Sequence, residues 1–341
     1  MAAGVAAVVV VGAVVGVRAA ASNDVDLPPV SPDRLAASAA AALARDPDIT
    51  GELRLHLDLG LPDVGATSLF DGSAVGFLLG DHTIRLWRSP FGARISIVEP
   101  NSEQAVYLGR TGAWAWDFSN LTATRLAPPG IRTGLFPLDL LVDEDMFRGL
   151  LHGLEPTTRV FVDGGVRVAG RDAYRLVLEP RTGETLIGRV EVDVDAEERI
   201  PLAARIYPRG STSAALSLEF TDVSYGDVDP AMFHFEPPAD ARVRDQPSAA
   251  GPLGLIGIAV AGATGATGEL TTRSFGHDWA SVVAIRWDES LRIPDDLSRY
   301  IPFSAPLVSV RQFGSPSGLW LLVGAVPQKA LERIGDRELS G

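Results

Sequence analysis

Three large aromatic residues at alternate positions form the most informative group in this sequence. Residues 104–126 are predicted to form two strands joined by a tight turn, and Trp114, Trp116 and Phe118 lie on the second strand. Successive side chains of a strand point to opposite faces, so these three rings are expected on one face. Such a wall of rings either fills a closed core or lines a hollow that holds an apolar guest. The residues alone leave both readings open.

No group of residues in the sequence predicts a catalytic centre. There is no Gly-x-Ser-x-Gly, no phosphate-binding loop and no Gly-x-Gly-x-x-Gly after a predicted strand. The best-spaced carboxylates, Asp193 and Asp195, alternate with Val192 and Val194 on a predicted strand and are expected on its solvated outer face. We therefore expect a binding protein and not an enzyme, although an enzyme acting on a lipid or a sugar stays open.

Metal and cofactor chemistry have little support in the composition. The five histidines are scattered without ligand spacing, and the chain has no cysteine, which excludes disulfides and thiolate ligands. We expect no metal site and no cofactor. The net charge of -13 and the lack of a basic run disfavour nucleic-acid binding, because phosphates would be repelled.

Alternating apolar residues continue the pattern on the strands that precede the aromatic wall. Residues 51–59, 83–88 and 93–99 alternate between apolar and polar side chains, which is typical of half-buried antiparallel strands. The side chains expected to face inward from these strands are Leu55, Leu57, Ile84, Leu86, Arg88, Ile95 and Ile97.

Two helices are expected beside these strands. Ser31 and Pro32 form an N-cap and first position for an Ala-rich helix that ends near residue 46. Residues 137–154 have helical spacing and place Leu141 and Phe147 on an apolar face. More strands follow from residue 159, and a further strand is expected at 74–79. One helix, a meander of strands, an inserted helix and more strands predict an antiparallel sheet with helices on one side.

The 341 residues allow more than one domain, and composition changes suggest the borders. Residues 1–21 contain an apolar run ending in Ala-x-Ala, which suggests an export signal, an uncleaved membrane anchor or a buried helix. Residues 22–32 are expected to be a tether, 33–246 the large domain and 247–268 a Gly-, Ala- and Pro-rich linker. Residues 269–341 are expected to form a small second domain with strands at 282–287 and 319–323 and a helix from Pro327.

The order of several motifs resembles the LolA/LppX/RseB superfamily of extracytoplasmic lipid-binding half-barrels, of the actinobacterial LolA-like type. In residues 83–126 a strand ending in Arg and Pro, a short strand and a Trp-rich hairpin follow one another as in LolA. The sequence FHFEPP at 233–238 resembles the superfamily's closing segment, and GRDAYRLVLEP at 170–180 resembles RseB. Segments 278–283 and 321–327 resemble the small C-terminal domain of RseB/MucB.

The resemblance implies an α+β fold: a curved antiparallel half-open β-barrel with helices covering the mouth, followed by a small α+β domain. It implies an exported protein whose hydrophobic cavity binds lipid or lipoprotein acyl chains, either as a carrier or, alternatively, as an envelope-stress sensor that binds a membrane anti-sigma factor. Arg88 matches an arginine that bonds a covering helix. The residues expected to contact lipid are Leu55, Leu57, Ile84, Leu86, Arg88, Ile95, Ile97, Trp114, Trp116, Phe118, Leu141 and Phe147.

Overall fold

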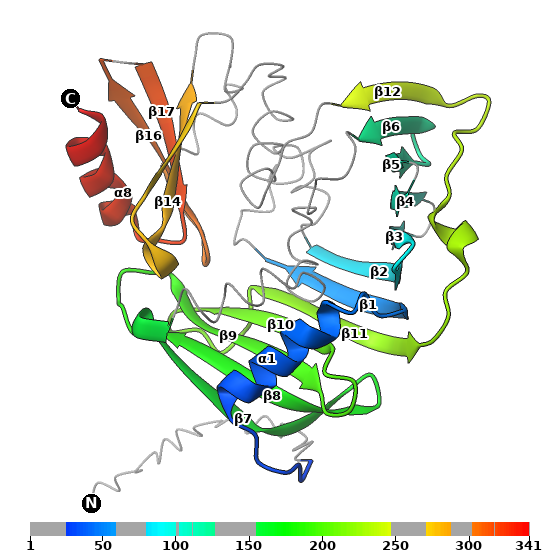
Figure 1. The fold of residues 1–341 in the computed structure, drawn as a ribbon. Helices are drawn as coiled ribbons and strands as arrows, with labels where there is room; N and C mark the ends of the chain where they lie inside the picture. The colour runs from blue at the N-terminus through cyan, green and yellow to red at the C-terminus, as the bar shows by residue number, and fades with distance from the viewer. Residues whose placement is uncertain are drawn as a thin grey trace, which may run out of the picture.

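The fold is that of a computed structural model of the chain (Figure 1). It describes residues 25–58, 80–99, 102–110, 112–126, 155–246, 271–287, 302–316 and 318–340. Within them, a 12-stranded sheet and a 5-stranded sheet carry most of the chain. The expectations for 1–21, 74–79, 137–154 and 247–268, including Leu141 and Phe147, fall outside the described residues. No helix among the described residues is long and apolar enough to cross a membrane.

The large sheet is open and curved, which confirms the predicted fold class. Its strands run in the order β12-β6-β5-β4-β3-β2-β1-β11-β10-β9-β8-β7, so the edges β12 and β7 are not joined to each other. All neighbours are antiparallel except β12 and β6. In Figure 1, β7–β11 lie across the lower part of the view, and β2–β6 extend upward from one side of them, so the sheet bends sharply. The strands are β1 Ile49–Leu57, β2 Gly80–Ser89, β3 Gly92–Glu99, β4 Ser102–Gly109, β5 Gly112–Asp117, β6 Thr122–Leu126, β7 Thr158–Val168, β8 Arg171–Pro180, β9 Ile187–Asp195, β10 Pro201–Pro208, β11 Leu216–Tyr225 and β12 Arg242–Gln246.

Helix α1, Pro32–Leu43, covers part of one face of this sheet, which we call the inner face. Its first turn is capped by Ser31, whose side chain accepts from the backbone N–H of Arg34 (3.4 Å). Alanine has the highest helix propensity and a small side chain, so the helix can pack close to the strands. Leu35 and Leu43 are fully buried and belong to the same hydrophobic cluster as the inner-face residues of the sheet.

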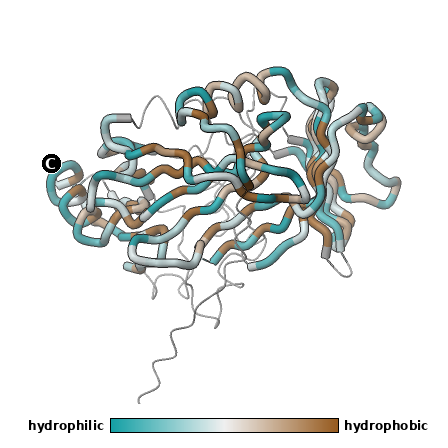
Figure 2. Tube along the Cα trace, turned by 90° about the horizontal axis from the view of Figure 1, so that it is seen from below, coloured by the Kyte–Doolittle hydropathy of each residue, from teal (hydrophilic) through white to brown (hydrophobic). Residues whose placement is uncertain are grey.

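The strand register shows which residues share the inner face. Directly paired residues of antiparallel strands point the same way, and Leu53 pairs with Ile84, which pairs with Ile97. All three are less than 10% exposed. Figure 2 shows hydrophobic and hydrophilic residues interspersed along the strands.

The same register places the tryptophans on the opposite, outer face. Trp114 pairs with Tyr107, which pairs with Arg94. Its neighbour Ala115 pairs with Val106, which pairs with the inner-face residue Ile95. The sequence predicted correctly that Trp114 and Trp116 share a face. The expectation that this face is the inner one is wrong. The alternation of side chains along a strand shows which residues share a face, but it does not show which of the two faces is the inner one.

Asp193 and Asp195 are buried, and the expectation that they are solvated is wrong. Asp193 is 0% exposed and accepts from Arg175 (2.7 Å) and Arg205 (2.6 Å) across the neighbouring strands. Asp195 is 1% exposed and bonds Arg171. Asp193 lies on the outer face, as expected, but Arg175 of β8 and Arg205 of β10 bond it there, while Asp195 also accepts from the hydroxyl of Tyr225 (3.2 Å). A buried carboxylate needs such partners, and these come from residues distant in sequence.

The second sheet is small and has its own core. Its strands are ordered β13-β14-β17-β16-β15, and helix α8, Gln328–Ile334, lies beside it in Figure 1. Trp320, Leu322 and Leu331 are the central buried residues. The expected strands at 282–287 and 319–323 correspond to β14 and β17. The strands are β13 Thr272–Phe275, β14 Val282–Trp287, β15 Phe303–Ser304, β16 Ser309–Ser315 and β17 Gly318–Gly324.

Candidate functional site

The inner face of the large sheet is the candidate binding surface. It is lined mainly by aliphatic side chains from seven neighbouring strands, β3, β2, β1, β11, β10, β9 and β8. On β1–β3 it carries the predicted residues Leu55, Leu57, Ile84, Leu86, Ile95 and Ile97, each less than 10% exposed. The strands β8–β11 continue it with Leu176, Leu178, Val190, Val192, Ile206, Leu216, Leu218 and Phe220.

Arg88 attaches helix α1 to this surface. Its Nη2 donates to the carbonyl oxygen of Leu43 (3.3 Å) and lies 3.0 Å from Asp46 Oδ1. The last carbonyls of a helix lack partners within the helix, and a cation near them is stabilised by the helix dipole. The Arg88 side chain is 14% exposed. The inward Arg88 thus bonds α1, while the covering helix expected at 137–154 lies outside the described residues.

The predicted aromatic residues do not join this surface. Phe235, from the segment that follows β11, packs over the wall on the outer face. Its ring centroid lies 4.7 Å from Tyr107, 5.8 Å from Trp114 and 5.7 Å from Trp116. Phe118 lies in the turn after β5 and is 55% exposed. Tyr107, Trp114 and Trp116 therefore form an outer-face wall that Phe235 covers, and Phe118 is not part of it.

Trp279 adds an aromatic residue to the inner face that sequence reasoning did not assign to it. It lies in the 3-10 turn η3, Asp278–Ala280, of the small sheet and is 8% exposed. Its Nε1–H donates to Thr158 Oγ1 (2.7 Å), and it belongs to the hydrophobic cluster of the large sheet. Thr158 begins β7 on the inner-face side, since Val160, two residues on, pairs with Leu178. The small sheet thus covers one end of the inner face.

A second connection between the sheets lies at residues 184–186. The backbone N–H of Leu186 and Thr185 Oγ1 both donate to the carbonyl oxygen of Ala325, at 2.8 and 2.9 Å. Arg333 of α8 lies 3.0 Å from Glu184. The two sheets are therefore joined by one backbone and one side-chain hydrogen bond to Ala325, as well as by the buried tryptophan.

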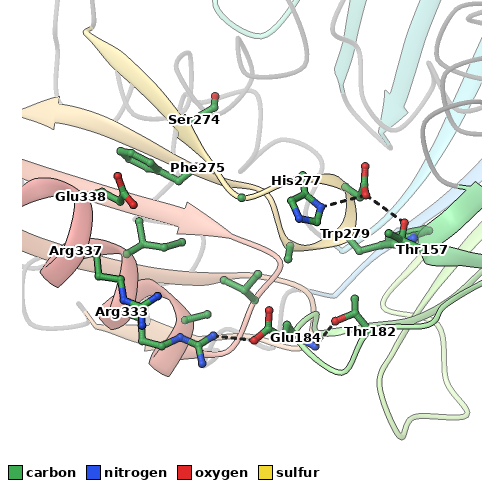
Figure 3. A pocket seen from close by; sticks show the side chains of 16 residues that line it. Thr157, Thr182, Glu184, Ser274, Phe275, His277, Trp279, Arg333, Arg337 and Glu338 are labelled. Carbon is green, nitrogen blue, oxygen red and sulfur yellow. Dashed lines mark hydrogen bonds and ion pairs between the residues drawn. The ribbon is translucent and has the colours of Figure 1, made fainter.

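A pocket of about 660 Å³ lies between these two connections. Figure 3 shows Arg333, Arg337 and Glu338 on one side of it and His277 and Trp279 on the other. Side chains of both charge signs line it, so it has no single electrostatic preference.

The polar groups of the pocket do not form a catalytic arrangement. Asp278 Oδ2 lies 3.2 Å from His277 Nδ1 and accepts from Thr157 Oγ1 (3.3 Å). The Asp278 carboxylate thus lies between the His277 imidazole and the Thr157 hydroxyl. In a nucleophile–base pair the imidazole and the hydroxyl would contact each other directly. Among the described residues, no group of three or more His, Asp and Glu side chains could hold a metal ion.

Comparisons with known proteins found similar folds among solved structures. No family model and no curated protein matches the chain. A crystal structure of MucB is 15% identical with a TM-score of 0.47, covering 89% of this chain and 96% of that one. The Pseudomonas aeruginosa MucA/MucB complex is 14% identical with a TM-score of 0.47, covering 88% and 95%. A LolA superfamily protein from Nitrosomonas europaea is 14% identical with a TM-score of 0.25, covering 61% and 99%.

At such identities and TM-scores the function has to be argued from this chain's own residues.

Proposed function

We propose that the chain is a non-enzymatic extracytoplasmic carrier that holds acyl chains of a lipid or lipoprotein against the inner face of its large sheet. The observation that supports this most is the continuous aliphatic surface across seven strands of an unclosed sheet. An acyl chain is recognised by apolar area alone, so such a site needs no catalytic or charged residue. The apolar N-terminal run at 2–17 supports export.

The energy available from such a surface is sufficient for a carrier. A chain of about 16 carbons gains ~0.8 kcal/mol per buried CH₂, or roughly 12 kcal/mol before costs. Association and ordering cost about 4 kcal/mol or more. The remainder, about 8 kcal/mol at most, corresponds to roughly micromolar affinity. Because this attraction is not directional, release requires a covering element to move, and α1, held by Arg88, is one described element that lies on the inner face.

Mass spectrometry of lipid that co-purifies with the protein tests this proposal. Ile97→Trp adds volume on the inner face and is expected to lower the amount of bound lipid several-fold, since a packed apolar site accommodates extra volume poorly. The matched control is Trp116→Leu on the outer face, which is expected to leave bound lipid unchanged. Circular dichroism verifies that both variants fold. Equal lipid content in the two variants, or no lipid in the wild type, would overturn the proposal.

The second candidate is a sensor in which the same inner face binds stray lipid and the small sheet carries a protein partner. The observation that favours it is the pocket between the sheets, which a carrier does not need. MucB is described in complex with MucA, and a membrane anti-sigma factor is the corresponding class of partner here. Affinity purification from membranes distinguishes the two candidates. A stoichiometric anti-sigma factor would favour the sensor, and its absence together with bound lipid would favour the carrier.

A further inference from the structure

A continuous row of apolar side chains crosses the inner face from β1 to β7. Each member pairs directly with the next across neighbouring strands, so all of them point to the same side of the sheet. We call it the apolar row, and in order across the strands it consists of Leu57, Leu216, Ile206, Val190, Leu178 and Val160. All of these except Val160 are less than 10% exposed. An acyl chain lying along the row is therefore in contact with aliphatic side chains over its whole length.

Trp279 of the small sheet lies at the β7 end of the apolar row. Its Nε1–H donates to Thr158 Oγ1 (2.7 Å), and Thr158 lies two residues before Val160, on the same face of β7. Its ring belongs to the hydrophobic cluster that contains the row. Because β7 is an edge of the large sheet, the row has no further strand on which to continue. Trp279 therefore closes the row at this edge.

The turn that carries Trp279 has a fixed and costly backbone geometry. Gly276 has a φ of 72°, and a Cβ at this position would lie 2.4 Å from the carbonyl oxygen of Ala280. Asp278, directly before Trp279, has a φ of 51°, a left-handed conformation that costs free energy in a residue with a side chain. Its carboxylate accepts from Thr157 Oγ1 (3.3 Å). These contacts hold a strained turn in the geometry that places the indole at the end of the row.

The pocket between the two sheets meets the same indole. Trp279 lines this pocket of about 660 Å³ and is also part of the inner-face cluster. Figure 3 shows it beside Thr157, where the pocket adjoins the large sheet. Phe275, Val326 and Ile334 also line the pocket, so an apolar chain that passed Trp279 would find apolar walls there. One side chain thus separates the end of the apolar row from the pocket.

We propose that Trp279 sets the length of the acyl chain that the inner face accepts, by acting as the stop at the β7 end of the apolar row. The inference rests on the proposed carrier function and adds to it a residue that selects among ligands. An acyl chain along the row meets the indole, and carbons beyond that length stay outside the apolar site. Without the indole, the chain continues into the pocket. The indole is suited to this role because moving it aside breaks its buried hydrogen bond to Thr158.

The test is competition between a fluorescent fatty acid and unlabelled laurate, palmitate, arachidate or lignocerate, in order of increasing length, for the delipidated full-length protein. In the wild type the affinity is expected to rise with length and then to level off, so that lignocerate binds as well as palmitate. Trp279→Ala is expected to raise the ratio of lignocerate to palmitate affinity about tenfold or more, because each further buried CH₂ contributes about a fourfold gain.

A second substitution tests whether the longer chain enters the pocket. Ser274 is exposed and lines the pocket, so a tryptophan there fills space without disturbing a core. Trp279→Ala combined with Ser274→Trp is expected to return the affinity ratio toward the wild-type value. Trp279→Leu, which keeps an apolar side chain in the cluster, is the milder form of the first substitution and is expected to raise the ratio less.

Two control variants separate the bulk of the indole from its part in joining the sheets. Thr158→Val removes the hydrogen-bond acceptor but keeps the indole, and it is expected to leave the affinity ratio unchanged. Trp116→Ala removes an indole from the outer face and is expected to leave the ratio unchanged as well.

The proposal is overturned if lignocerate gains nothing over palmitate in both Trp279→Ala and Trp279→Leu, or if Ser274→Trp fails to reverse the gain. It is also overturned if Thr158→Val raises the ratio as much as Trp279→Ala, because loosening of the two sheets would then be the cause. In each of these cases palmitate binding by the wild type leaves the carrier proposal standing. If the wild type binds no fatty acid, both proposals fail.

Discussion

Arg88 of β2 donates a hydrogen bond to the carbonyl oxygen of Leu43, 45 residues earlier, and so joins the last turn of α1 to the sheet. The contact is made by a charged donor to a helix-end carbonyl that also accepts from the backbone N–H of Asp46 (3.1 Å). It ties the covering helix to β2, the strand beside β1, and the Arg88 side chain is only 14% exposed. Displacement of α1 from the inner face requires this contact to break.

Replacing Arg88 with methionine is therefore expected to destabilise the protein by about 1.5–3 kcal/mol, the usual worth of a hydrogen bond to a charged group. Methionine keeps most of the apolar stem, so the loss reports on the guanidinium. Urea unfolding measures the change. Exchange of bound lipid with added fluorescent fatty acid is expected to accelerate, since α1 is less firmly held.

Arg85→Met is the control for this substitution. Arg85 lies three residues earlier on the same strand but on the outer face, where it is 52% exposed and 3.7 Å from Glu52. An exposed pair of this kind contributes at most about 1 kcal/mol. If the two variants unfold at the same urea concentration, the Leu43 contact does not stabilise the helix.

Trp279 is expected to hold the small sheet on the large one through its indole N–H. Trp279→Phe keeps an aromatic ring but leaves the Thr158 hydroxyl, at a position 2% exposed, without its donor. The cost is expected to be about 1–3 kcal/mol. In Trp279→Phe combined with Thr158→Val, no unsatisfied group remains, so the double variant is expected to be no less stable than Trp279→Phe alone. Additive losses in urea unfolding would contradict a direct interaction.

Asp195 is expected to give the stability of the large sheet a dependence on acid pH. Burial alone would raise its pKa, but hydrogen bonds from Arg171 and from the backbone N–H groups of Glu198 and Glu197 outweigh this and lower the pKa. A carboxyl whose pKa is lower in the folded state stabilises it above the unfolded pKa of about 4, and this stabilisation is lost as the pH falls through the folded value.

The free energy of unfolding of the wild type is thus expected to fall more steeply below about pH 4 than that of Asp195→Asn. Near neutral pH the asparagine variant is expected to be the less stable of the two, and the difference should shrink on acidification. Urea titrations across this pH range measure both curves. Asp245→Asn, at an exposed position 3.7 Å from Arg125, serves as control and should parallel the wild type. A constant difference between wild type and Asp195→Asn would exclude the carboxylate as the cause.

Alternation within a strand was sufficient to predict much of the large sheet. Leu53, Leu55 and Leu57 were placed on one buried face by their spacing, and Ile84 and Ile97 joined them because each strand had the same pattern. The helix at Ser31 was predicted from its cap. These features depend on neighbours in sequence, which is why they could be read without coordinates.

The errors concern properties that distant residues determine. Trp114 faces outward because the register with β4 and β3 places it beside Tyr107, and Phe235, 121 residues later, then covers it. Asp193 is buried because Arg175 and Arg205 from two other strands pair with it. Neither partner is visible in the local pattern, where a tryptophan suggests a core and an aspartate suggests solvent.

The outer-face wall predicts that the segment after β11 stabilises the sheet from its outer side. Phe235 is partly buried and stacks on Tyr107, with Trp114 and Trp116 beside it. Phe235→Ala is expected to cost about 2 kcal/mol from lost apolar area and ring contacts. It is also expected to make residues 226–241 more sensitive to protease, because the ring holds that segment on the sheet. Phe91→Ala, at an exposed turn, should change neither property. If protease cleaves both variants and the wild type at equal rates, Phe235 does not fasten the segment, and the wall would need another role.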